Sequence, residues 1–404
     1  MIQTPAAVKR PQPTLRRPWI GLSDIWHNLT FRAWFYQLAV IGFILLSAAY
    51  LIGNAQDALR SLGISTGFDF LFEPAGFDIG EKPIAFQSTD SFARAYAVAL
   101  LNTLKVAAIS IVLATLIGVT IGIARLSSNI LIRGFASFYV ELFRNTPQLV
   151  QLIFWYAVIT QLPPVRQALS VLDVAFLSNR GLVVPWPMEA EIFAGVIGAF
   201  LASGVLAALF IRWTDKRRRM TGRKQQAALP TAAAIFFAAP LLIWAVSGAS
   251  TAVSVPQLQG FNFRGGATLS PEFIALLLGL SLYIAAFIAE IVRSGIQSVG
   301  RGQIEAARAI GLSQSDIYRK VILPQALRVM VPPTAAQYVS LVKNSSLGVA
   351  IGYPELFNIN NTIITLSGHT VEAIGIMMAI YLSISFSIAA LMNLYNRHVQ
   401  IRER

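Results

Sequence analysis

The sequence predicts an all-α membrane protein with about eight transmembrane helices. Of its 404 residues, 55% are hydrophobic and only 13% are charged, whereas soluble domains carry about 25% charged residues. The apolar residues form long runs, and a helix needs about 20 residues to cross the hydrocarbon layer. Such runs must be helical because no water is available there to satisfy the backbone. The lack of cysteine excludes a disulfide scaffold and any cysteine-based metal or redox site.

Eight apolar runs are predicted to span the membrane. The first, fourth, fifth and eighth contain almost no charge, whereas the others carry one or two ionisable residues. The first run follows 36 residues, and we expect a permanent anchor there rather than a cleavable signal peptide. The predicted spans are 37–54, 97–124, 135–162, 192–211, 229–248, 271–292, 333–352 and 371–394.

The positions of lysine and arginine predict the orientation. Most of the 32 basic residues fall in every second segment between spans, above all in the first 36 residues, in 212–224 and in 293–332. Cytoplasmic loops are rich in these residues, so we expect both chain ends to be cytoplasmic. Membrane orientation then explains the net charge of +13 without a nucleic-acid partner. The acidic outer loop 55–96 is either a solvated loop or a contact surface for a soluble partner.

The segment 293–332 is too long for a simple connection, because helices are usually joined by about 2–8 residues. Residues 305–310 are mostly good helix formers, and Gly311 is expected to end that helix. Ser313 opens a second predicted helix over 314–322 through a capping box, and a proline that follows is expected to end or kink it. The segment therefore predicts a pair of short helices.

Three residues of the first short helix suit docking better than catalysis. Ala306 and Ala307 have almost no side chain, so another protein's backbone could approach closely. Glu305 is expected in the first turn, where the helix dipole stabilises its carboxylate. We expect this carboxylate to meet a basic residue of a partner.

This segment resembles the EAA loop of ABC-importer permeases. The pattern of that loop is EAA-x3-G-x9-I-x-LP, and Val321 stands here in the place of the isoleucine. The residues that match the pattern are Glu305, Ala306, Ala307, Gly311, Leu323 and Pro324.

The resemblance extends beyond the loop. Segments 283–299, 324–333, 340–347 and 141–152 are similar to the polar amino acid branch of these permeases. Together the matches cover about 97–162 and 271–397, which correspond to the family's five-helix core. The resemblance thus implies a permease core with a cytoplasmic coupling helix pair.

The chain is larger than the shortest members of the family. Residues 163–270 interrupt the core with two more spans, and residues 1–96 add one span and the acidic loop. This layout is similar to the Q-type permease subunit of the general L-amino-acid ABC transporter and its glutamate/glutamine/aspartate/asparagine relatives. The basic hairpin within the insertion either sets the topology or contacts lipid headgroups.

These inferences divide the chain into seven parts. They are a basic cytoplasmic N-terminus 1–36, an extra helix 37–54, the acidic external loop 55–96, the first core part 97–162 with two helices, the insertion 163–270 with two extra helices and a basic cytoplasmic loop, the second core part 271–397 with the coupling loop at 293–332, and a cytoplasmic tail 398–404.

The resemblance implies an importer of polar L-amino acids in the bacterial cytoplasmic (inner) membrane. Its expected partners are an external solute-binding protein, a dimer of cytoplasmic ATP-binding cassette subunits and a second, related permease. The sequence lacks the phosphate-binding pattern G-x-x-x-x-G-K-[ST]. We therefore expect no cofactor in this chain, ATP and Mg bound by the partner subunit, and no enzymatic activity of its own.

Polar residues within the predicted spans are candidates for the substrate path, because such residues are costly in a membrane. Glu290 either faces the pore or pairs with Arg293. Arg144 and Gln148 either hold a substrate carboxylate, or Arg144 simply pairs with Glu141. The full set of candidates is Glu290, Lys343, Asn344, Ser345, Arg144 and Gln148.

Around Lys343, Asn344 and Ser345 the alternative is a lysine that reaches the membrane surface beside serines bonded to their own helix. Lys105, near the outer end of its span, is expected to reach the surface in the same way. The three histidines have no metal-ligand spacing, so no metal site is expected.

Two rival functions remain open. An ion-coupled secondary transporter would show a relay of intramembrane acids and internal inverted repeats, whereas we find one deep acid and no clear repeat. A scaffold permease without its own substrate pocket, working beside a substrate-carrying partner, is compatible with the sequence. A membrane-embedded enzyme would need clustered histidines or acids at the membrane face, which this sequence does not supply.

Overall fold

A computed structural model describes residues 29–61, 67–188, 190–221, 227–247 and 253–399. Most of the predicted N-terminal and C-terminal cytoplasmic segments, and residues 222–226 of the basic loop, lie outside this part. The helices are α2 (Leu29–Ser61), α3 (Phe92–Ala124), α4 (Ile130–Asn145), α5 (Gln148–Thr160), α6 (Ala190–Thr221), α7 (Ala228–Ser247), α8 (Pro271–Gln297), α9 (Arg301–Ala309), α10 (Gln314–Asp316), α11 (Leu323–Asn344), α12 (Leu356–Ser367) and α13 (Thr370–Val399). The strands are β1 (Leu169–Val171), β2 (Ala175–Ser178), β3 (Gly181–Val184), β4 (Trp186–Pro187), β5 (Val253–Ser254), β6 (Gln257–Gln259), β7 (Asn262–Arg264) and β8 (Ala267–Leu269).

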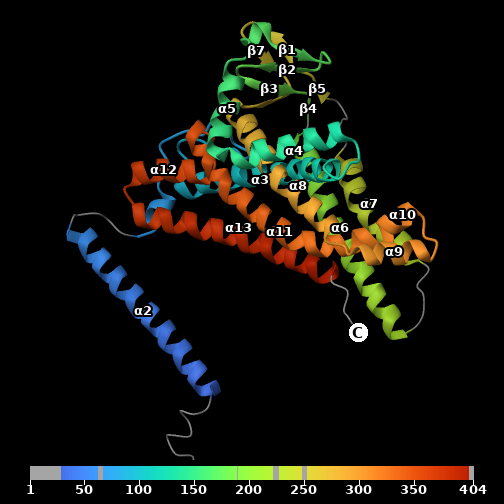
Figure 1. Cartoon of the computed structure of the whole chain (residues 1–404). Helices are drawn as coiled ribbons and strands as arrows, with labels where there is room; N and C mark the ends of the chain where they lie inside the picture. Colours follow the sequence, from blue (N-terminus) through green and yellow to red (C-terminus); the bar gives the residue numbers. More distant parts are fainter. Residues whose placement is uncertain (1–28, 62–66, 189, 222–226, 248–252, 400–404) are drawn as a thin grey trace, which may run out of the picture. The chain divides into compact units, whose positions relative to one another are not determined.

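The chain forms two compact units that divide after Gly67. The first contains the single helix α2, whose apolar side chains are exposed along its length. This is typical of a helix whose surroundings are lipid. The second unit contains all the other elements (Figure 1).

Helices α3 and α8 form the centre of the second unit and run parallel. Gly118 and Gly122 of α3 face Ile288 and Val292 of α8. Glycines four residues apart let two membrane helices approach closely. The main buried cluster grows from this contact and includes residues from α3, α5, α8 and α11.

The predicted span 135–162 is wrong in one respect, because the structure breaks it into α4 and α5. The chain is extended at Thr146 and Pro147, and a proline disfavours the helical conformation of the residue before it. The amide of Gln151 donates to the carbonyls of Phe143 and Thr146 and so satisfies backbone groups at the break.

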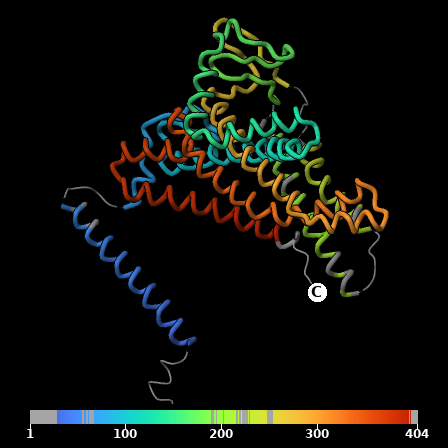
Figure 2. The backbone as a smooth tube through the Cα atoms, in the orientation of Figure 1, coloured from blue at the N-terminus to red at the C-terminus, as the bar shows by residue number. Residues whose placement is uncertain are grey.

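The insertion contains strands that the sequence analysis did not predict. Helices α6 and α7 form a hairpin that packs Phe200 against Phe236. The segments before and after this hairpin meet in one β unit, where strands pair antiparallel in the order β1-β2-β3-β8, and β4 pairs with β5 (Figure 2). A third pair joins β6 and β7.

The predicted span 333–352 also differs from the structure. Helix α11 begins ten residues earlier, and a 3-10 turn over Ser345–Ile351 follows it. Glu355 then caps the short helix α12, which was not predicted. The last helix, α13, packs along α11 and α12 (Figure 1).

Among the described residues, five helices are long and apolar enough to cross a membrane. They correspond to the first, second, fourth, sixth and eighth predicted spans, at Leu29–Asn54, Phe92–Ala124, Gly195–Thr214, Pro271–Gln297 and Thr370–Leu394. Two shorter apolar helices cover Gln148–Thr160 and Pro230–Val246. The prediction of a mainly helical membrane protein is confirmed, and the count of eight spans is not.

Candidate functional site

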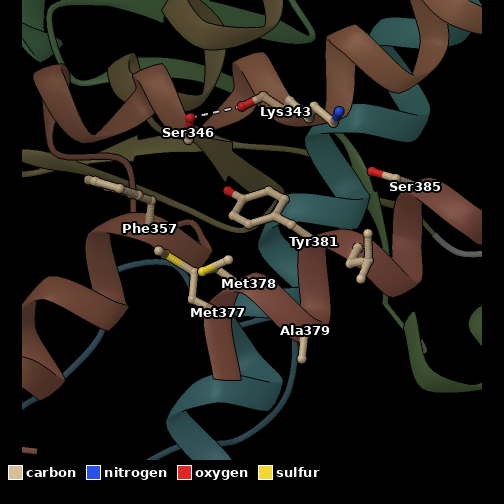
Figure 3. Close-up of a pocket in the computed structure, with 9 residues that line it drawn as sticks. Lys343, Ser346, Phe357, Met377, Met378, Ala379, Tyr381 and Ser385 are labelled. Carbon is tan, nitrogen blue, oxygen red and sulfur yellow. Dashed lines mark hydrogen bonds between the residues drawn. The ribbon is translucent and has the colours of Figure 1, made fainter. Parts of the chain in front are cut away.

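The described residues contain a cavity of about 460 Å³ between α11, α12 and α13. Ligand pockets for small molecules typically measure about 300–1,000 Å³. Figure 3 shows the ring of Tyr381 between Lys343 and Ser346 on one side and Met377 and Met378 on the other. The lining residues are Lys343, Ser346, Phe357, Met377, Met378, Ala379, Tyr381, Leu382 and Ser385.

The cavity combines apolar walls with one cationic side chain. Lys343 supplies the cation, and Ser346 and Ser385 supply further polar side chains, whereas Tyr381 contributes its ring and donates its hydroxyl group to Glu355. A lysine ammonium can bind a carboxylate, whereas methionine adapts to side chains of different shape. This combination suits a small molecule that carries a carboxylate and a variable side chain.

The structure brings two other predicted residues together, although neither lines the cavity. The amide of Asn344 donates to the side-chain oxygen of Gln148 over 2.6 Å, which joins the end of α11 to the start of α5. Ser345 is buried and donates to the carbonyl of Val342. That bond is the helix-backbone contact that the sequence analysis gave as the alternative for the serines.

Glu290 does not line the cavity. Its carboxylate forms ion pairs with Arg293, one turn further along α8, and with Arg125 at the end of α3. Of the two alternatives for Glu290, the pairing with Arg293 is present in the structure. Arg125, which the sequence analysis did not connect with this acid, ties α3 to α8.

Neither predicted role of Arg144, binding a substrate carboxylate or pairing with Glu141, is seen in the structure. Its guanidinium lies over the ring of Phe287 at 5.3 Å from the centroid, and no ion pair with Glu141 occurs among the described residues. Glu141 instead accepts a hydrogen bond from Asn145. Arg144 is exposed and is not among the residues that line the cavity.

Lys105 was expected to extend to the membrane surface, but in the structure it has specific partners. Its ammonium pairs with Glu81 over 3.0 Å and lies 4.4 Å from the centre of the Phe273 ring. Glu81 also accepts from Ser270, the residue that caps α8. A residue of the predicted acidic loop therefore fastens that loop to α3 and α8.

The predicted coupling helix is α9, and two expectations for it are wrong. Glu305 is exposed but lies in the second turn, because the helix already begins at Arg301. Ala306 is exposed, whereas Ala307 is buried in the main core cluster together with Ile317. The small side chain of Ala307 thus lets α9 pack on its own chain, and only Glu305 and Ala306 remain available to a partner.

Gly311 ends the helix as predicted. Its φ angle is +79°, which favours glycine. Its N–H donates to the carbonyl of Arg308, and that of Leu312 donates to Ala307. These two bonds form a Schellman motif, which fixes the direction in which the chain leaves α9.

The second predicted short helix, over 314–322, does not end at Pro324. A π-helical turn over Ile317–Ile322 connects α10 directly to α11, and Pro324 lies in the first turn of α11 beside the exposed Leu323. The wider turn accommodates the proline, whose ring would clash with a carbonyl one turn earlier. The side chain of Gln325 donates to the carbonyl of Val321. The predicted helix pair is therefore α9 and one long, bent helical segment.

Sequence reasoning missed apolar residues on this surface. Ile310 is 77% exposed at the end of α9, and Tyr318 is 51% exposed on the π-helical turn. These two exposed apolar side chains belong to the same predicted coupling segment, 293–332, as Glu305. Nothing in the helical periodicity distinguished them from buried positions.

Glu355 was also missed. It is fully buried and caps α12 with its side chain. Burial raises the pKa of Glu355 to about 7, while the backbone N–H groups of Phe357 and Asn358 oppose this shift. A single acid in a short connection gave no sign of burial in the sequence.

Comparison with known proteins identifies related chains. Residues 110–403 match the family model described as "Binding-protein-dependent transport system inner membrane component". The putative amino-acid ABC transporter permease protein YhdX of Escherichia coli (strain K12) is 44% identical over 96% of this chain and 99% of that protein. The general L-amino acid transport system permease protein AapQ of Rhizobium johnstonii is 41% identical over 93% of this chain and 94% of that protein.

A further relative is the glutamate/glutamine/aspartate/asparagine transport system permease protein BztB of Rhodobacter capsulatus. It is 35% identical over 95% of this chain and 97% of that protein. Among solved structures, an amino acid ABC transporter crystallised with histidines matches with a TM-score of 0.45 and 21% identity, over 76% of this chain and 95% of that one.

Proposed function

The chain belongs to the family of binding-protein-dependent transport system inner membrane components, and we propose that it is the permease subunit of an ATP-driven importer of polar L-amino acids. The observation that carries this proposal is the similarity along nearly the whole chain to permeases of amino-acid transport systems. The chain is a multi-pass protein of the bacterial inner membrane and is not itself an enzyme. ATP and Mg would bind to a partner subunit.

The substrate would bind in the cavity at Lys343. The ammonium of Lys343 would hold the α-carboxylate, and Met377, Met378 and Phe357 would contact the substrate side chain. Asn344 and Gln148 support the same region through their mutual hydrogen bond. Glu290 would hold α3 and α8 together rather than bind the substrate, because both of its carboxylate oxygens form ion pairs with arginines.

Coupling to ATP hydrolysis would pass through α9. Glu305, Ala306 and Ile310 are exposed there, while the buried Ala307 lies in α9, which packs on the π-helical turn that leads into α11. A push on α9 would therefore move α11, whose end carries Lys343, as a rigid body. This requires α9 and both chain ends to face the cytoplasm, and it requires the β unit to face outward.

The partners would be a dimer of ATP-binding cassette subunits, a second related permease and an external solute-binding protein. The test is to purify the complex through a tag on this chain and to reconstitute it in proteoliposomes. We expect a nucleotide-binding subunit and a second permease to co-purify, and uptake of amino acids to require ATP and the binding protein. Isolation of this chain alone, with uptake driven by an ion gradient, would contradict the proposal.

The role of the cavity is tested with Lys343→Met, which removes the charge, and Lys343→Arg, which keeps it. We expect the first variant to weaken amino-acid uptake and the second to retain most of it. Unchanged uptake in Lys343→Met would indicate that the partner permease alone carries the substrate.

A further inference from the structure

Glu355 is a buried carboxylate that no ion pair among the described residues neutralises. It accepts three hydrogen bonds instead. The backbone N–H groups of Phe357 and Asn358 donate to it over 2.8 Å each, and the hydroxyl group of Tyr381 donates over 2.9 Å. Burying a charge is costly unless hydrogen bonds compensate it, and these three donors offset part of that cost.

Two of the three donors connect Glu355 to the wall of the cavity. Phe357 and Tyr381 both line the cavity, whereas Glu355 lies behind them and does not. Its side chain also lies close to Gly348 in the 3-10 turn, where an added Cβ would come 3.3 Å from the Cγ of Glu355. The side chain of Glu355 thus lies against the 3-10 turn, α12 and α13, and its carboxylate accepts a hydrogen bond from the hydroxyl group of Tyr381.

Capping of α12 alone does not account for this residue. An N-cap needs only a side-chain acceptor for the first backbone N–H groups, and Ser, Thr, Asp and Asn are preferred there. The bond to Tyr381 belongs to a different helix, α13, 26 residues further along the chain. Tyr381 could lose that bond without any change in the cap.

We propose that Glu355 is a positioning residue of the substrate pocket, which holds the hydroxyl group of Tyr381 and the start of α12 so that Tyr381 and Phe357 form a fixed wall beside Lys343. This inference rests on the proposed function, because it takes the cavity as the substrate site. A fixed aromatic wall decides which substrate side chains fit. Release of the wall therefore weakens substrate binding without removing any group that contacts the nucleotide-binding partner.

The test measures ATP-driven amino-acid uptake by the reconstituted complex with Glu355→Gln, Tyr381→Phe and the double variant. A hydrogen bond to a charged group contributes enough free energy for about a tenfold effect on an equilibrium. We expect each single variant to raise the KM for the amino acid about five- to tenfold, with the maximal rate within about twofold of the parent. Glu355→Gln weakens and Tyr381→Phe removes the same contact, so the double variant is expected to resemble Tyr381→Phe.

Tyr353→Phe is the matched control. Tyr353 is buried nearby and donates weakly to the carbonyl of Asn102 over 3.4 Å, but it does not line the cavity. Removal of the Tyr353 hydroxyl group is expected to leave the KM for the amino acid unchanged. If Glu355→Gln fails to assemble, Tyr381→Phe still tests the proposal, because it keeps the carboxylate and the cap of α12.

Two results would overturn the inference. If Lys343→Met raises the KM but Glu355→Gln and Tyr381→Phe do not, or if their effects simply add, Glu355 does not position the pocket, although the cavity remains the substrate site. If Lys343→Met leaves the KM unchanged, the cavity is not the substrate site, and the role of Glu355 is rejected with it.

Discussion

Gly118 of α3 lies so close to Ile288 of α8 that a Cβ atom placed on the glycine would come within 2.7 Å of the isoleucine Cβ. The same face of α3 carries Gly122, where an added Cβ would meet the backbone oxygen of Ala289 at 2.7 Å. Polar clusters join the same two helices on either side of this contact, Lys105 with Glu81 and Ser270 toward their N-terminal ends, and Arg125 with Glu290 at their C-terminal ends. Helices α3 and α8 are therefore held together along most of their length.

Gly118→Ala is expected to destabilise the protein. The added methyl group has no room, and overpacking typically costs about 1–3 kcal/mol. The measurement is the temperature at which half of the detergent-solubilised complex loses its native elution volume. Gly134→Ala is the control, because Gly134 lies in α4 with nothing within 4 Å of an added Cβ. Equal melting temperatures for the two variants would contradict the tight contact.

Glu290 and Arg125 are expected to be energetically coupled. Their side chains are only 26% and 13% exposed, and such pairs interact more strongly than exposed ones. A double-mutant cycle with Glu290→Gln and Arg125→Met should give a coupling free energy of about 1–2 kcal/mol in the unfolding of the complex. The exposed pair of Asp316 and Lys320 serves as the control, with an expected coupling clearly smaller than that of the buried pair. Additive effects of the first pair would show that it does not fasten the helices.

Glu305→Lys is expected to abolish the stimulation of ATP hydrolysis by substrate-loaded binding protein while membrane insertion persists. The reversed charge would repel a basic residue of the docking subunit. Gln303→Lys, on the same exposed helix, adds the same charge two residues away and is expected to have a smaller effect, because residues two apart on a helix face different directions. Normal stimulation in Glu305→Lys would remove α9 from the coupling path.

Gly311→Pro is expected to uncouple the complex in the same assay. The φ of +79° is closed to proline, whose φ is fixed near −65°, and the substitution removes the N–H that bonds to Arg308. Gly302→Ala, a glycine in α9 with no neighbour within 4 Å of an added Cβ, is the control. Equal stimulation of ATP hydrolysis in Gly311→Pro and Gly302→Ala would mean that the direction in which the chain leaves α9 does not matter for coupling.

Glu355 is expected to make stability depend on pH. Its folded-state pKa of about 7 lies above the reference value of 4.5, so the folded state keeps a proton that the unfolded state releases. The contribution of Glu355 to the free energy of unfolding is fully present below pH 4.5. It decreases by up to about 3 kcal/mol as the pH rises toward 7. The phenol groups of Tyr353 and Tyr381 are titratable neighbours of Glu355, and a free phenol stays protonated throughout this window.

The measurement compares the melting temperature of the parent complex with that of Glu355→Gln from pH 5 to pH 8. The parent is expected to lose stability relative to the variant as the pH rises. Parallel curves would show that Glu355 does not change its charge in this range.

The parts of the fold that depend on local sequence were predictable. Long apolar runs gave five membrane-length helices, and the cap at Ser313 and the stop at Gly311 follow from backbone preferences within a few residues. Pro147 is a possible helix break in the sequence. The apolar residues on both sides of it nevertheless led to the prediction of one continuous span. Local patterns therefore located helices better than they located the breaks between them.

The parts that depend on distant contacts were not predictable. Strand β3 pairs with β8 across the whole α6–α7 hairpin, and no short pattern encodes that pairing. Likewise, Lys105 meets Glu81 and Glu355 meets Tyr381 only after the helices have packed. Of the candidate substrate residues, Lys343 lines the cavity, and Glu290 is held by arginines whose proximity only the fold determines.

The most direct test of the account is cross-linking from Ile310→Cys. The chain contains no cysteine, so this position becomes its only thiol. With a bifunctional thiol-to-amine reagent in inverted membrane vesicles, the account predicts a covalent product that contains this chain and the nucleotide-binding subunit. Labelling of the same thiol by a membrane-impermeant maleimide added to the outside of intact cells, without any such product, would contradict it.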